Sequence, residues 1–118
     1  MEIIKTPEQP VNENVEREMS NAELALEARR NGDEQLALFY EKAKEGVDKP
    51  AYPEVLLEMR SLFYRNRDTI KDSRLYPDVV LNDTTKMLNE WMKISYPNLP
   101  EMDNIQVEQA LVKYFEIK

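Results

Sequence analysis

Paired carboxylates are the side chains of this sequence whose spacing could support chemistry. Glu23 and Glu27, and likewise Glu41 and Glu45, stand four residues apart, which places each pair on one face of a helix. Two such carboxylates can act as general acid and base or hold a magnesium ion. The pairs lie beside basic residues, as Glu41 lies beside Lys42, and the sequence contains no D-x-D-x-D-G calcium loop. We therefore expect these carboxylates on solvated helix surfaces.

The residue types that the sequence lacks exclude several common active sites. It contains no Cys and no His, so it has no thiolate or imidazole nucleophile, no imidazole base, no disulfide and no ordinary zinc site. Its two glycines, Gly32 and Gly46, cannot supply a GxxxxGK[ST] or GxGxxG phosphate loop. We predict that the protein is not an enzyme and uses no catalytic residue, cofactor or bound metal.

Positive charge is concentrated in one segment of an otherwise acidic chain. The sequence contains 16 Lys and Arg against 23 Asp and Glu, a net charge of −7, which opposes a simple phosphate-binding role. Between positions 60 and 74, however, basic residues outnumber Asp68 and Asp72. The candidate contact residues of this basic segment are Arg60, Tyr64, Arg65, Arg67, Lys71 and Arg74. They could contact nucleic-acid phosphates or an acidic partner, or form the solvated end of a helix.

The first 19 residues differ in composition from the rest of the chain. They include Pro7 and Pro10 and are predominantly acidic, which predicts a flexible, extended acidic arm. Ile3, Ile4 and Val11 are apolar residues within this arm. An extended segment of this kind can add to the edge of a partner's sheet or fill a groove, so these three residues are candidate partner contacts. Alternatively, the arm is a terminus without a binding role.

The residues after the arm carry the signals of a helical hairpin. Ser20 opens an S-x-x-E capping box, and Gly32 ends the first helix. Asp33 can cap a second helix, which Gly46 ends. Because the connection between the two helices is short, they must be close antiparallel neighbours. We therefore predict a helical hairpin over residues 20–46.

Three more helices are predicted in the rest of the chain. Their ranges are 53–71, 77–95 and 103–116. Pro53 suits the first position of a helix, and Asp103 can cap the last one. The run Val79-Val80-Leu81 could instead be a short strand, because β-branched residues favour strands. The predicted fold class is all-α: a single compact bundle of about five short helices over residues 20–118, preceded by the arm.

Large apolar residues recur at helical spacing in the helix predicted over 77–95. The predicted buried face consists of Val80, Leu81, Thr84, Met87, Leu88, Trp91 and Ile94. Together with Met59 and Met92, the residues Met87 and Trp91 could line an adaptable groove, since Met adapts its shape to several partners. The favoured interpretation is a core. Of these four residues, Met92 is expected to be the most exposed, because it lies off the stripe.

The turn and the second helix of the hairpin combine a Gly at the turn, small Ala at the helix contact and aromatic residues between the helices. The residues are Asn31, Gly32, Asp33, Leu36, Ala37, Phe39, Tyr40, Glu41, Lys42 and Ala43. In this respect the segment over about 20–46 resembles one unit of the tetratricopeptide repeat family. No second copy follows about 34 residues later, whereas a solenoid needs roughly three repeats. An ordinary helical hairpin is favoured, and no peptide-binding groove is inferred from the resemblance.

The charge and the missing catalytic groups favour a non-enzymatic protein–protein interaction module, such as a small helical adaptor, inhibitor or assembly factor. Two alternatives are a nucleic-acid-associated regulator that uses residues 60–74 and an acidic inhibitor that mimics DNA. The abundance of Asn, Lys, Glu and Ile resembles that of small proteins of phages and mobile elements. We expect another protein as the partner, because the net charge disfavours nucleic acid. Association of this chain with copies of itself is also compatible with the sequence.

The sequence also predicts where the protein acts. No apolar run approaches the roughly 18 residues that a membrane span needs. The N-terminus has no apolar stretch of signal-peptide length and no small-residue cleavage site. We therefore expect a cytoplasmic protein with no membrane partner.

Overall fold

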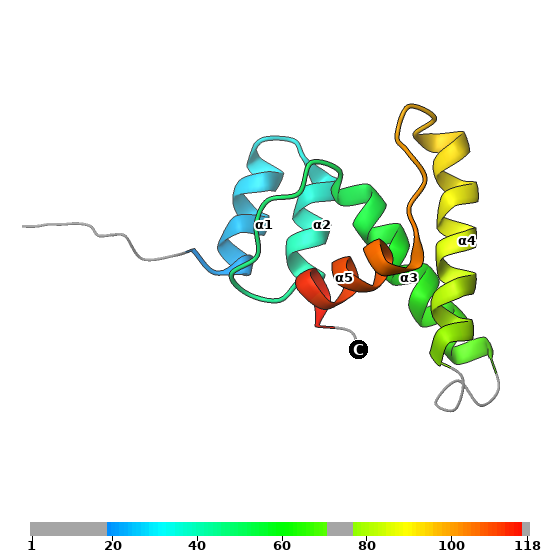
Figure 1. Cartoon of the computed structure of the whole chain (residues 1–118). Coiled ribbons are helices and arrows are strands. Elements are labelled where there is room, and N and C mark those ends of the chain that lie inside the picture. The colour runs from blue at the N-terminus through cyan, green and yellow to red at the C-terminus, as the bar shows by residue number, and fades with distance from the viewer. Residues whose placement is uncertain (1–18, 71–76, 117–118) are drawn as a thin grey trace, which may run out of the picture.

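The computed structural model describes residues 19–70 and 77–116, and every regular element in these ranges is an α-helix (Figure 1). The helices are α1 (Asn21–Arg30), α2 (Glu34–Lys42), α3 (Pro53–Thr69), α4 (Pro77–Ser95) and α5 (Asn104–Phe115). The predicted all-α bundle of five helices is therefore confirmed. Of the predicted arm, only Met19 lies within the described residues.

Local capping signals set the start of most helices. The Ser20 side chain accepts a hydrogen bond from the Glu23 amide, and the Glu23 carboxylate accepts one from the Ser20 amide. Asp103 and Gln106 form the same reciprocal box at α5. Asp33 caps α2 through the amide of Leu36, as predicted. These contacts involve residues three apart, so the sequence alone specifies them.

The second helix ends at Lys42, four residues before Gly46, which is earlier than predicted. The side-chain amide of Asn21 donates hydrogen bonds to the carbonyl oxygens of Ala43 and Lys44, at 2.8 and 2.9 Å. The amide of Lys44 in turn donates to the carbonyl of Tyr114 in α5. Because partners outside α2 satisfy these backbone groups, the chain leaves the helix at Ala43.

The fourth helix spans Pro77–Ser95 as predicted, and Val79–Leu81 is part of it, so the strand alternative is wrong. Three assignments on this helix are also wrong: Met92 is buried, at 4% exposure, whereas Ile94 is 85% exposed. Met87, at 39%, is exposed as well. Four of the five buried residues of α4 form a row at four-residue spacing: Val80, Thr84, Leu88 and Met92. Such a row is inclined to the helix axis, so the contact moves towards Met92 and away from Ile94.

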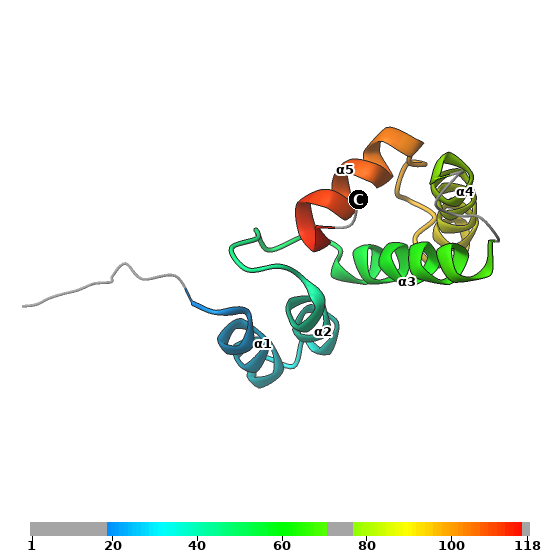
Figure 2. The same ribbon diagram turned by 90° about the horizontal axis from the view of Figure 1, so that it is seen from below.

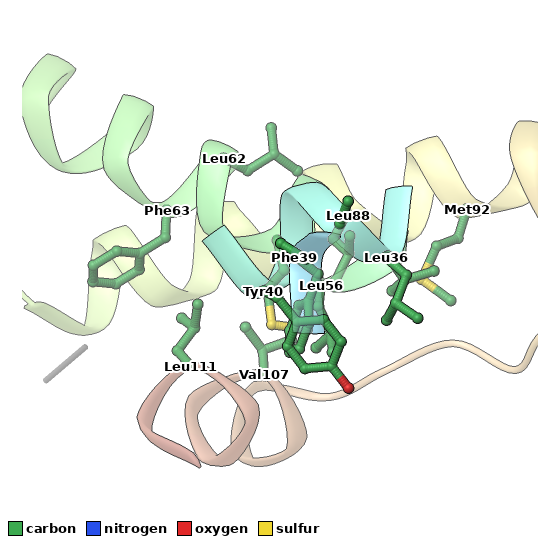
Figure 3. Close-up of a cluster of buried hydrophobic side chains, with 14 of the residues drawn as sticks. Leu36, Phe39, Tyr40, Leu56, Leu62, Phe63, Leu88, Met92, Val107 and Leu111 are labelled. Carbon is green, nitrogen blue, oxygen red and sulfur yellow. The ribbon is translucent and has the colours of Figure 1, made fainter. Parts of the chain in front are cut away.

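The third helix, α3, organises the core. In Figures 1 and 2 it lies between the α1–α2 hairpin and α4, and it also packs against α5. Figure 3 shows buried side chains from α2, α3, α4 and α5 in one cluster. Phe39 of α2 is fully buried, and its ring makes edge contacts with the rings of Tyr40, Tyr114 and Phe115 at 5.5, 5.5 and 5.7 Å. Phe39 therefore joins the hairpin to the end of α5.

Candidate functional site

An open groove runs along α3 between α2 and α4. Its volume is about 810 Å³, within the range of roughly 300–1,000 Å³ that is typical of ligand clefts. The lining residues are Gln35, Leu38 and Lys42 of α2, Glu54, Leu57, Glu58, Arg60, Ser61 and Tyr64 of α3, and Trp91, Ser95 and Tyr96 at the end of α4. We call this surface the α3 groove.

The floor of the α3 groove is one row of α3 side chains. Leu57, Ser61 and Tyr64 are spaced by four and three residues, so they share one face of the helix. Leu57 and Tyr64 are half-buried, and the small Ser61 lies between them. Leu38 of α2 and Trp91 of α4, also half-buried, stand on the two sides. The floor therefore offers apolar surface with a gap at Ser61.

Charged side chains of opposite sign lie on the two edges of this row. Glu54 and Glu58 are one helical turn apart and share one edge, whereas Arg60 lies on the other edge. The ion pairs among the described residues lie elsewhere: Arg29 with Glu34 and Glu41, Lys93 with Glu101, and Lys113 with Asp48. The groove charges are therefore not neutralised by ion pairs within the described part of the chain.

Two arginines contact the ring of Tyr64. The guanidinium carbons of Arg60 and Arg67 lie 4.7 and 4.5 Å from its centroid, and Arg60 also lies 5.8 Å from the ring of Phe115. Cation–π contacts of this kind hold the arginine side chains in place while leaving their N–H groups able to bind carboxylates. Arg60 lines the α3 groove, and Arg67 lies beside it on the ring of Tyr64, so this cluster marks the positively charged end of the groove.

Aromatic side chains form the opposite end. The ring of Tyr96 lies 5.6 Å from that of Trp91 and 5.7 Å from that of Tyr52. Burial, and then the hydrogen bond to the neighbouring Glu54 carboxylate, raise the pKa of Tyr96. This end of the groove therefore combines aromatic surface with the negative charge of Glu54.

Apolar surface continues from the groove over α4. Met87, Trp91 and Ile94 are spaced by four and three residues and share one face of that helix. Met87 and Ile94 are 39% and 85% exposed. Large apolar side chains beside a groove indicate a surface for contact with another molecule.

The structure divides the predicted basic segment. Arg60, Tyr64 and Arg67 come together, as described above. Arg65 is exposed and lies about 140° around the helix axis from Arg60, so it does not join them. The other predicted contact residues, Ile3, Ile4, Val11, Lys71 and Arg74, lie outside the described residues.

Four groove residues were not predicted from the sequence as candidate site residues: Leu38, Leu57, Glu54 and Glu58. A signal was available in the apolar periodicity, because the buried stripes that it predicts for the second and third helices leave out Leu38 and Leu57. These stripes are Leu36, Phe39, Tyr40 and Ala43, and Val55, Leu56, Met59, Leu62, Phe63 and Ile70. Trp91, interpreted as core, is half-buried and lines the groove. The interpretation of Met59 as a core residue is confirmed.

Three of the four carboxylates whose spacing could support chemistry, Glu23, Glu41 and Glu45, make structural contacts. Glu41 accepts a hydrogen bond of 2.7 Å from Arg29, and this bond raises the pKa of Arg29 and lowers that of Glu41. Glu45 accepts one from the backbone amide of Asn21. Within residues 19–70 and 77–116, no group of three or more acidic side chains is arranged to hold a metal ion. Over the same ranges, no helix has both the length and the apolar character needed to cross a membrane.

Comparison with protein-family models, with curated proteins and with solved structures found no match for this chain.

Proposed function

We propose that this chain is a non-enzymatic protein–protein interaction module, an adaptor, inhibitor or assembly factor, that binds its partner in the α3 groove. The observation that carries the proposal is the groove itself: an apolar floor with charged side chains on both edges, continuous with the exposed Met87 and Ile94. Interfaces between proteins combine these same features, an apolar centre and a polar rim.

The groove side chains offer little for catalysis. Ser61 is the hydroxyl at the centre of the floor, but the sequence contains no His to act as its base. The remaining polar groups are suited to recognition by hydrogen bonds and ion pairs. This chemistry supports a binding role.

Protein is favoured over nucleic acid as the partner. Arg60 and Arg67 could contact phosphates, but Glu54 and Glu58 lie within a few turns on the same helix and would repel a phosphate backbone. The net charge of −7 adds to this repulsion. A DNA-mimicking inhibitor would instead need a continuous acidic surface, which the cationic end of the groove interrupts.

Site-specific photocrosslinking tests the proposal. The photoreactive residue p-benzoylphenylalanine replaces Leu38 or Trp91 in the groove and, as a matched control, Leu26, which is 55% exposed on α1. In a lysate of the native cell, we expect the same discrete protein adduct from both groove positions, resistant to nuclease and absent from the control. Equal adducts from all three positions, no adduct from the groove, or adducts with nucleic acid would contradict the proposal.

A further inference from the structure

We propose that the α3 groove receives an amphipathic α-helix of the partner protein, acidic in its N-terminal half and basic in its C-terminal half, lying antiparallel to α3. This inference rests on the proposed function and names the chemistry of the partner. It is argued from the backbone around the groove, the shape of its floor and the order of its charges.

The backbone around the groove favours a helical occupant. The lining side chains come from α2, α3 and α4, whose N–H and C=O groups bond within their own helices. An extended peptide would bury its backbone groups here without partners, at a cost for each group. A helix satisfies its own backbone and presents only side chains, which is the helix-in-groove mode of recognition.

The floor has the spacing that a helix can match. Leu57, Ser61 and Tyr64 lie one turn apart along α3, and the small Ser61 leaves room between two larger side chains. A partner helix with apolar residues at i, i+3 or i+4, and i+7 can place its middle side chain over Ser61. Leu38 and Trp91 then contact the flanks of this apolar stripe.

The charges are ordered along the groove. On α3, Glu54 and Glu58 precede Arg60, which lines the groove, and Arg67, which lies beside the groove on the Tyr64 ring. The midpoints of the two pairs are about 11 Å apart along the axis. A complementary helix is therefore basic beside the glutamates and acidic beside the arginines. Helices are intrinsically more stable with acidic residues first and basic residues last, because this order opposes the helix dipole. That order matches the groove only when the partner helix runs antiparallel to α3.

A second copy of this chain is a poorer occupant. Two grooves facing each other are both concave and would leave unfilled space between them. Insertion of a different surface of the second copy would be a head-to-tail contact, which generates an open chain of molecules unless it closes into a ring. Two copies also carry −7 each. The favoured occupant is therefore a helix of another protein.

Binding of three labelled 18-residue peptides to the full-length protein tests the inference. They share one apolar stripe and differ only in charge: acidic then basic (EK), wholly basic (KK) and wholly acidic (EE). We expect EK to bind about tenfold more tightly than KK or EE, a difference of about 1.4 kcal/mol in binding free energy. A control version of EK with serines in place of the apolar stripe should not bind. Attraction by net charge alone would rank KK first, so a KK preference overturns the inference.

Variants and a spin label sharpen this test. The double variant Arg60→Gln/Arg67→Gln should lose the preference for EK over KK, whereas the control Arg30→Gln/Lys86→Gln, which removes the same charge from exposed positions, should keep it. A nitroxide at the N-terminus of EK should broaden NMR signals near Arg67; broadening near Glu54 would refute the antiparallel direction.

Each remaining outcome also decides the matter. An EE preference, equal binding of the three peptides, or no binding of EK overturns the inference. The inference is also overturned if sedimentation shows that the free protein self-associates, that a Trp91→Ala variant does not, and that EK dissociates the oligomer. If the groove positions crosslink a protein but EK shows no preference, the helix inference fails while the proposed function stands; absence of groove crosslinks removes the proposed function itself.

Discussion

Truncation of Phe39 tests whether the hairpin packs on α5 as the structure shows. Each of the three edge contacts of its ring contributes about 0.5–1.5 kcal/mol beyond burial, so Phe39→Leu should lower the free energy of unfolding by about 2 kcal/mol. Phe39→Ala adds a cavity and should cost about 3–5 kcal/mol. Since a domain of this size has about 5–15 kcal/mol in total, the alanine variant should be marginally folded.

Urea denaturation followed by circular dichroism measures these losses. Leu26→Ala, at an exposed position of α1, should change the free energy of unfolding by less than about 0.5 kcal/mol. A double-mutant cycle of Phe39→Leu with Phe115→Leu should give a coupling energy of about 0.5–1.5 kcal/mol. A loss below about 1 kcal/mol for Phe39→Ala, or no coupling, would refute the α2–α5 contact and with it the position of the α2 side of the groove.

Three further perturbations probe local features. Ser20→Ala removes the capping box of α1 and should cost about 1 kcal/mol in urea denaturation; Ser20→Asp, which can also cap, should restore most of it. Asn89→Ala removes two 2.8 Å hydrogen bonds to the backbone of Met102, so it should cost about 1–3 kcal/mol and speed amide exchange in the loop between α4 and α5. The pKa of Glu41 is lowered in the folded state by Arg29, so its contribution to stability is present above the pKa of unfolded Glu, about 4.3, and is lost as the pH falls through the lower folded value. Glu41→Gln should therefore lose stability at pH 7 but not at pH 2, and an equal loss at both pH values would contradict this linkage.

The α3 groove could not be predicted from the sequence, because its lining comes from three helices that are separate in the chain. Arg60, Tyr64 and Arg67 share one face of a single helix, so their contact follows from local spacing. Glu54 and Trp91 are 37 positions apart, and they line the same groove only because α4 packs antiparallel to α3. The sequence could show only that Leu38 and Leu57 lie off the buried stripes.

Local signals determined the helices of this protein, because each acts within one turn of the chain. Ser20, Asp33, Pro53 and Asp103 begin their helices where the residue types predict. On α4 the helical period also predicted Val80, Thr84 and Leu88 on the buried face, where they lie. These features depend on backbone geometry and near neighbours, so no tertiary information was needed.

Tertiary packing decided which part of each apolar face is covered. On α4, Met92 is buried and Ile94 is exposed, although Ile94 fits the helical period better. Packing also buries Asn66 of α3, whose side-chain amide donates a 3.2 Å hydrogen bond to the hydroxyl of Thr84 in α4. The hydrogen-bond partner of this buried polar group therefore comes from a different helix. The physical reason is that burial depends on where other helices lie, whereas periodicity reports only the direction in which a side chain points.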